Sequence, residues 1–103
     1  MGLKKLAKFE FVWRAMNGQK LIPEHRSHPT RKWRVDWFHE SGVAVEIEGS
    51  VWTQGRHTRG SGFLADIEKY NALAEQGILL FRVPAHDVTI KRRAIYRAIN
   101  KMV

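Results

Sequence analysis

The chain of 103 residues contains no cysteine. This absence excludes disulfide bonds, thiolate zinc sites and cysteine nucleophiles. No stretch approaches the roughly 18 consecutive apolar residues that a membrane-spanning helix needs. The first residues also lack the apolar core and the cleavage site of a signal peptide. These absences predict a soluble cytoplasmic protein, and the length predicts a single domain over residues 1–103 with one core.

Acidic residues are also scarce, with 10 Asp and Glu against 18 Lys and Arg, a net charge of +8 and a pI near 10.3. Such a basic excess favours nucleic acid as the partner, because contacts with phosphates release counterions and drive binding. Solubility alone is the alternative explanation. The distribution of charge favours the first, because residues 43–52 contain no Lys or Arg and basic segments lie on both sides.

The acidic centre is a predicted β-hairpin. Two apolar runs, residues 33–38 and 43–49, are joined by a short turn-forming sequence. Asp36, Glu46 and Glu48 interrupt these runs, although carboxylates are rarely buried without a partner. Glu46 and Glu48 are two residues apart and therefore face the same side of the sheet. Three acids on one face within a basic chain predict a divalent-metal site for phosphodiester chemistry.

Hydrophobic periodicity predicts the remaining elements. A helix is expected over residues 3–17, ending at Asn17-Gly18, and an edge strand is expected within residues 21–28. A helix over 63–76, ended by Gly77, precedes an apolar strand over 78–83 that favours parallel pairing beside the hairpin. Asp87 is expected to cap a last helix over 88–102. The order α-β-β-β-α-β-α predicts an α/β fold with a mixed sheet flanked by helices.

Basic and glycine-rich loops flank the hairpin. Glycine lets a backbone approach a ligand closely, and arginine binds phosphate oxygens in a forked geometry. A histidine in such a loop can orient a water or protonate a leaving group. Solvated surface loops are the alternative interpretation. The residues predicted to contact nucleic acid are Arg31, Lys32, Arg34, Trp52, Arg56 and Arg59, with His57 as a catalytic candidate.

Two helical residues have two interpretations each. Glu10 either pairs with Arg14 four residues later or reaches over the sheet to the metal. Lys69 either pairs with Asp66 or faces the acids and polarises a phosphate. Periodicity alone leaves both alternatives open.

An acid on one strand, an acid-x-acid ten residues later, then a helix and a strand resembles the PD-(D/E)XK nuclease superfamily. Residues 43–49, followed by Trp52, Arg56, His57, Asp66, Lys69 and the strand 78–83, are similar to very-short-patch-repair endonucleases and the related DUF559 proteins, many of them encoded by phages. The likeness spans about residues 9 to 100. It implies a restriction-endonuclease-like α-β-β-β-α-β core with an extra C-terminal helix, in a bacterial or phage-infected cell.

The resemblance also implies roles for individual residues. Asp36 and Glu46 match the metal-binding acids, the Ile47 carbonyl matches a backbone ligand, and Glu10 matches a helical glutamate. His57 and His28 are acid or base candidates by analogy. Glu48 stands where the superfamily usually has lysine, so it adds a ligand or recruits a second ion, and Lys69 becomes the candidate for the role of that lysine.

The leading hypothesis is a Mg²⁺-dependent DNA endonuclease, nicking or structure-selective, with Mn²⁺ as a substitute. Mg²⁺ prefers oxygen ligands, which the acids provide. RNA stays open as a substrate, and a homodimer is an arrangement that many small nucleases adopt. One alternative is a catalytically inactive nucleic-acid-binding module in which Glu48 marks lost activity. Another is a basic structural protein whose acids are ordinary ion-pair partners of Arg34, Arg56 or Lys69.

Overall fold

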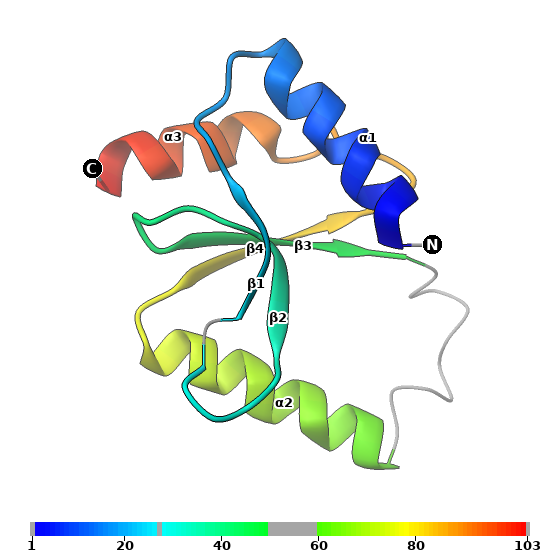
Figure 1. Cartoon of the computed structure of the whole chain (residues 1–103), viewed down its shortest axis with the longest axis vertical. Helices are drawn as coiled ribbons and strands as arrows, with labels where there is room; N and C mark the ends of the chain where they lie inside the picture. Colours follow the sequence, from blue (N-terminus) through cyan, green and yellow to red (C-terminus); the bar gives the residue numbers. More distant parts are fainter. Residues whose placement is uncertain (1, 27, 50–59, 103) are drawn as a thin grey trace.

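A computed structural model describes residues 2–26, 28–49 and 60–102. A four-stranded sheet lies between two helical layers, with α1 and α3 on one face and α2 on the other (Figure 1). No helix among these described residues is long and apolar enough to cross a membrane. The elements in chain order are α1 (Gly2–Ala15), β1 (Ile22–Arg26), β2 (Arg34–Phe38), β3 (Val43–Glu48), α2 (Gly60–Glu75), β4 (Leu79–Pro84) and α3 (Arg92–Met102).

The sheet has the strand order β1-β2-β3-β4. β1 pairs with β2 and β2 with β3 in antiparallel fashion, whereas β3 pairs with β4 in parallel. The predicted element order, the hairpin, the edge strand and the parallel pairing are therefore confirmed. The long β3–β4 ladder, from Val43–Leu79 to Glu48–Pro84, fixes Arg82 beside Glu46.

The helix ends follow the expected chemistry. Asn17 and Gly77, each two residues beyond the last residue of α1 or α2, adopt positive φ angles of 58° and 77°. The N–H of Gly18 donates to the Trp13 carbonyl at 3.0 Å, and the N–H of Ile78 donates to the Leu73 carbonyl at 3.0 Å. These bonds form the left-handed C-terminal motif that satisfies the last carbonyls of a helix, so both predicted ends are confirmed.

The start of α3 was predicted wrongly. The helix begins at Arg92, and residues 88–91 form turns. The Asp87 carboxylate accepts the N–H of Thr89 at 3.1 Å and also its hydroxyl. This local turn competes with helix formation, so Asp87 caps a turn and the helix starts one turn later. The start of α2 also differs, because this helix begins at Gly60 and not at Phe63.

The two faces of the sheet are packed differently. The face under α1 and α3 has ten buried hydrophobic residues: Phe9, Trp13, Trp37, Val43, Val45, Ile47, Val83, Val88, Ile95 and Ile99. On the face under α2, the buried hydrophobic residues of the described part of the chain are Val35, Ala44 and Leu73. The charged residues Glu46 and Glu48 of β3 lie on this side of the sheet, where they meet Lys69 and Tyr70 of α2.

Gly18 is required by close packing against Trp13. A methyl group at this position would overlap the indole ring, which is 4% exposed. We expect Gly18→Ala to lower the free energy of unfolding by about 1–3 kcal/mol because the ring must move. Urea unfolding measures the change. Gly49→Ala is the matched control, since its new methyl would lie 3.8 Å from the Ala85 side chain, an ordinary contact. Equal stability of the two variants would contradict the packing argument.

Candidate functional site

Glu46 is the one charged side chain that is buried in the described part of the chain, with 9% exposure. It lies in the middle of β3, where five of six residues are buried. Burial raises the pKa of Glu46, and the neighbouring charges of Asp36 and Glu48 raise it further. Lys69 opposes this rise, because its ammonium donates a hydrogen bond from α2 to Glu46 Oε2. The structure thus selects the acid-facing alternative for Lys69.

Asp36 lies on the neighbouring strand β2, at the point where the side chains stop alternating regularly between the two faces of the sheet. Its Oδ2 accepts the backbone N–H of Ile47 at 2.7 Å, so a side chain bridges β2 and β3. Val35 packs with the α2 layer, whereas Trp37, two residues later, packs with α1 and α3. Residues two apart on a regular strand share a face, so the strand twists locally at Asp36. This twist brings the Asp36 carboxylate to the strand that carries Glu46.

Glu48 faces the same layer as Glu46, as predicted, and two partners hold its carboxylate. Arg82 Nε donates to Glu48 Oε2 at 2.9 Å, and the Tyr70 hydroxyl donates to the same oxygen at 3.4 Å. The bond to Glu48 raises the pKa of Arg82. Burial, with the charges of Glu48 and Glu46, raises the pKa of Tyr70. The guanidinium also lies 4.9 Å from the centre of the Tyr70 ring.

Sequence reasoning missed Tyr70 and Arg82 as members of this site. The available signal was a charged residue inside the otherwise apolar strand 78–83, directly beside an acidic strand. An arginine there needs an anionic partner for the same reason that the acids need a cation.

The donor atoms at this site suit a hard divalent cation in part. Asp36 and Glu46 supply carboxylate oxygens from adjacent strands, the ligand type that Mg²⁺ prefers. Among residues 2–26, 28–49 and 60–102, however, no group of three or more His, Asp or Glu side chains is arranged to hold a metal. The fit is therefore to two carboxylates with water completing the coordination. The assignment of Glu48 and the Ile47 carbonyl as ligands stays a prediction.

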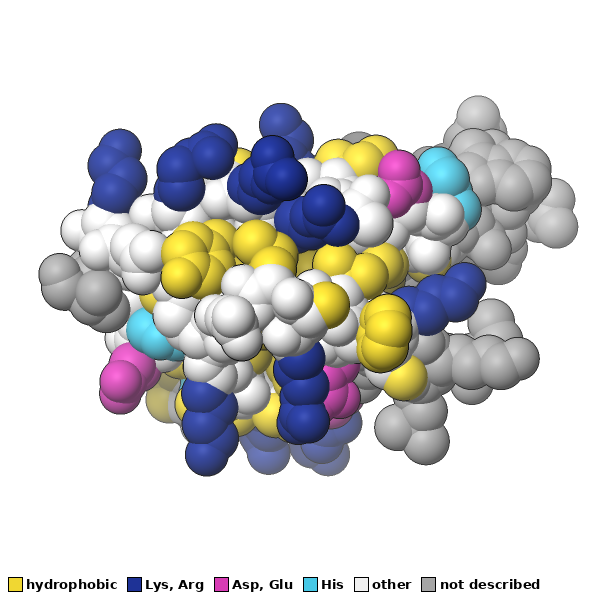
Figure 2. All heavy atoms as spheres, turned by 90° about the horizontal axis from the view of Figure 1, so that it is seen from above, with side chains coloured by type: hydrophobic (Ala, Val, Ile, Leu, Met, Phe, Trp, Pro, Cys, Tyr) yellow, Lys and Arg dark blue, Asp and Glu magenta, His cyan; other side chains and the backbone are white. Residues whose placement is uncertain are grey.

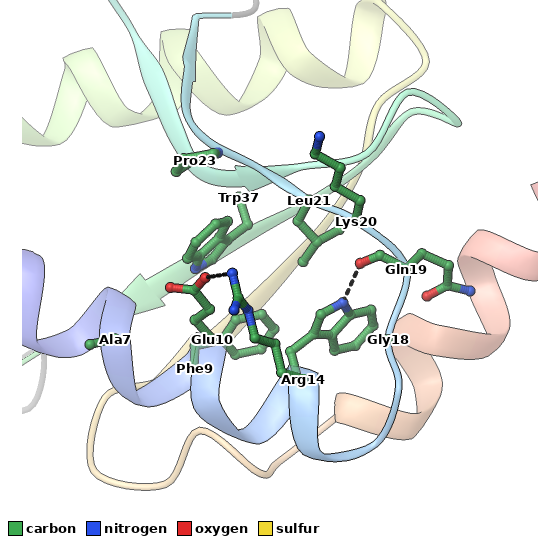
Figure 3. A pocket seen from close by; sticks show the side chains of 11 residues that line it. Ala7, Phe9, Glu10, Arg14, Gly18, Gln19, Lys20, Leu21, Pro23 and Trp37 are labelled. Atoms are coloured by element: carbon green, nitrogen blue, oxygen red, sulfur yellow. Dashed lines mark hydrogen bonds and ion pairs between the residues drawn. The ribbon is translucent and has the colours of Figure 1, made fainter.

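Glu10 lies on the opposite side of the sheet from Lys69. It pairs with Arg14 at 2.7 Å, which is the surface pairing that the sequence allowed. Both residues line a hollow of about 760 Å³ between α1 and the start of β1, with Trp37 at its wall (Figure 3). The structure does not bring Glu10 to Glu46, and its metal-site role stays a prediction.

The predicted nucleic-acid contacts are placed only in part. Arg31 pairs with Glu68 at 3.3 Å and lies 4.2 Å from the centre of the Trp33 ring. Lys32 and Arg34 are exposed beside it. His28 Nδ1 accepts the N–H groups of Thr30 and Arg31, so it organises the loop before β2. Trp52, Arg56, His57 and Arg59 lie outside the described residues.

The Lys69–Glu46 pair predicts a specific pattern of stability. We expect Lys69→Met to lower the free energy of unfolding by about 1–3 kcal/mol at pH 7, because it leaves a buried carboxylate without its cation. The pKa of Glu46 then rises further in the folded state. A group whose pKa is raised by folding adds stability at low pH, and this stability is lost as the pH rises through the folded pKa. The loss of stability in Lys69→Met should therefore be smaller at pH 4 than at pH 7. Urea unfolding at both pH values measures it.

Two further variants test the cause. Glu46→Gln combined with Lys69→Met removes both charges and should recover part of the lost stability. Lys8→Met, at an exposed helical lysine, should change stability by less than about 0.5 kcal/mol at either pH. A Lys69→Met deficit that is independent of pH would contradict the electrostatic explanation.

No protein-family model matches the chain, and no curated protein matches it in sequence. Its fold is similar to that of a solved structure, the homing endonuclease I-Bth0305I catalytic domain. The TM-score is 0.64 at 14% sequence identity, over 95% of this chain and 91% of that chain. The similarity agrees with the expected nuclease-like α/β arrangement. At this identity the likeness concerns the fold alone.

Proposed function

We propose that this chain is a Mg²⁺-dependent endonuclease that hydrolyses phosphodiester bonds in DNA. The observation that carries the proposal is a buried carboxylate, Glu46, beside a second carboxylate on the next strand and bonded to a lysine from the helix above. Carboxylates of this kind with a neighbouring ammonium are the groups that metal-assisted phosphodiester hydrolysis needs. The fold similarity to a homing endonuclease catalytic domain supports the same class of reaction.

In this proposal Asp36 and Glu46 hold the ion, with the Ile47 carbonyl as an additional ligand. Bound Mg²⁺ would lower the pKa of an attacking water and neutralise charge on the reacting phosphate. Lys69 neutralises Glu46 through its hydrogen bond, and it is the cation proposed to polarise a phosphate oxygen at the site. Mn²⁺ is expected to substitute, since it takes the same oxygen ligands.

Glu48 is the departure from the superfamily pattern, and the proposal gives it a positioning role. The position usually occupied by lysine carries an acid, yet that acid binds Arg82 and Tyr70. A cation therefore remains at this end of β3, supplied by Arg82 and Lys69. Glu48 orients the guanidinium toward the same face that Glu46 occupies.

The substrate contacts extend the site to the basic segments on either side. Arg31 and Lys32 precede β2, the strand that carries Asp36, and Arg34 is its first residue. The net charge of +8 favours a polyanion. Trp52, Arg56 and Arg59 are proposed as further contacts, with His57 as a general acid. A homodimer, RNA as a second substrate and a cytoplasmic location are compatible with the proposal.

A catalytically inactive nucleic-acid-binding module is the second candidate. One observation favours it: Lys69 and Arg82 already bind Glu46 and Glu48 directly. Charges satisfied in this way require no ion for stability. The cleavage experiment below separates the two functions.

Removing either proposed ligand should abolish cleavage. We expect Asp36→Asn and Glu46→Gln to lower the rate of plasmid nicking with Mg²⁺ or Mn²⁺ by at least about 100-fold, because the ion loses a charged ligand. Asp36→Asn keeps an oxygen that can accept the Ile47 N–H, so folding should persist. Gel assays of supercoiled plasmid measure the rate.

Binding and stability measurements serve as controls for these variants. Both should bind DNA as the wild type does, and wild type alone should gain melting temperature in millimolar Mn²⁺. Lys8→Gln, on an exposed lysine of α1, should cleave normally. A wild type that binds DNA and never cleaves would establish the inactive module.

The raised pKa of Glu46 predicts the acidic limb of the pH profile. Protonated Glu46 cannot hold a cation, so cleavage should increase with pH across the folded pKa of this group. In the metal-free protein, the direction of the shift places the midpoint of the Glu46 titration above the ordinary value of 4.5. Glu48→Gln should move the midpoint down, because the charge of Glu48 raises the pKa of Glu46. Carboxyl ¹³C NMR titration reports the same pKa without catalysis; a midpoint at or below 4.5 would refute this electrostatic account.

A further inference from the structure

α3 carries a group of cations that the candidate site does not use. This basic row consists of Lys91 and Arg92 at the start of the helix and of Arg93, Arg97 and Lys101 at four-residue intervals. With a rise of about 1.5 Å per residue, the last three lie about 6 Å apart along one side of the helix. Figure 2, which looks onto the α1 and α3 layer, shows rows of Lys and Arg side chains along two opposite edges of this face.

The folding of the chain does not explain this row. α3 contains no acidic residue, and no described carboxylate forms an ion pair with any of these cations. Like charges four residues apart on a helix repel and destabilise it. Arg93, Arg97 and Lys101 form two such neighbouring pairs in succession. A bound polyanion would relieve that repulsion.

The other face of α3 limits the kind of polyanion. Ile95 and Ile99 are fully buried, and Tyr96 and Ala98 pack against the same core. The helix therefore has no free apolar face to insert into a bilayer, as a membrane-surface helix requires. Arginine side chains on a rigidly packed helix suit the regularly spaced oxygens of a phosphodiester backbone.

α3 also lies on the opposite side of the sheet from α2, which provides Lys69 (Figure 1). A backbone held along α3 is therefore separated from Glu46 by the sheet. We propose that the basic row binds the phosphate backbone of a nucleic-acid segment outside the candidate site. This inference rests on the proposed nucleic-acid substrate and adds a second, sequence-independent contact to it.

Salt dependence of binding tests the row. The double variant Arg93→Gln/Arg97→Gln is compared with Lys8→Gln/Lys20→Gln, which removes the same charge from exposed positions outside the row. Binding to a short fluorescent DNA duplex is measured without divalent metal between about 50 and 200 mM salt. The slope of log affinity against log salt should fall in magnitude by about two in the row variant and stay unchanged in the control.

The melting temperature of the row variant should equal or exceed that of the wild type, because like-charge repulsion is removed. Equal slopes for the row variant and the control would overturn the proposal. The proposal would also be overturned if the row variant lost binding to phosphatidylserine vesicles while its binding to the duplex stayed unchanged. The binding assay contains no metal, so its result does not depend on cleavage. If the row variant shows the reduced slope but the wild type never cleaves plasmid with metal, the row is supported and only the proposed endonuclease is contradicted. Cleavage by wild type with equal slopes contradicts only the row.

Discussion

A buried carboxylate on an inner strand is the constraint around which this molecule is arranged. Glu46 lies in β3 between apolar neighbours, and ionising it there is costly unless a cation is close. Lys69 meets that need only while α2 keeps its present position along the sheet. A shift of α2 by one turn, about 5.4 Å, would leave a buried charge unpaired. The pair therefore specifies how α2 packs on the sheet.

The local twist of β2 at Asp36 also shapes the site around Glu46. The pairing of β1 and β2 passes from Pro23–Trp37 to His25–Val35, and Glu24, between them, has a positive φ of 53°. The distortion thus involves both strands at the level of Asp36. One consequence is that Val35 and Trp37 pack on opposite faces of the sheet. The other is that the Asp36 carboxylate bonds to β3 instead of pointing away from it.

Local pattern predicted the elements well because each has a strong signal: apolar runs for strands, periodicity for helices, and Asn17-Gly18 and Gly77 for helix ends. It failed at α3, where the Asp87–Thr89 turn competes with the helix. The sequence indicated a cluster of acids at the hairpin, but it did not indicate which cation would pair with each acid. Whether Lys69 meets Asp66 or Glu46, and whether Arg82 meets Glu48, depends on the register between distant elements. The local twist of β2 at Asp36 could not be predicted, because apolar and polar residues alternate regularly in the sequence there.

The ion pairs of the site link Glu48 to the way a metal would bind. Among the described residues, Lys69 balances the charge of Glu46 and Arg82 balances that of Glu48 at this end of β3. Without these two cations, the carboxylates would repel a phosphate. Mg²⁺ is commonly held by one or two carboxylates together with substrate phosphates. In the proposed endonuclease, Asp36 and Glu46 would therefore hold the ion together with a substrate phosphate. Arg82 would neutralise Glu48, so that this acid does not repel the phosphate.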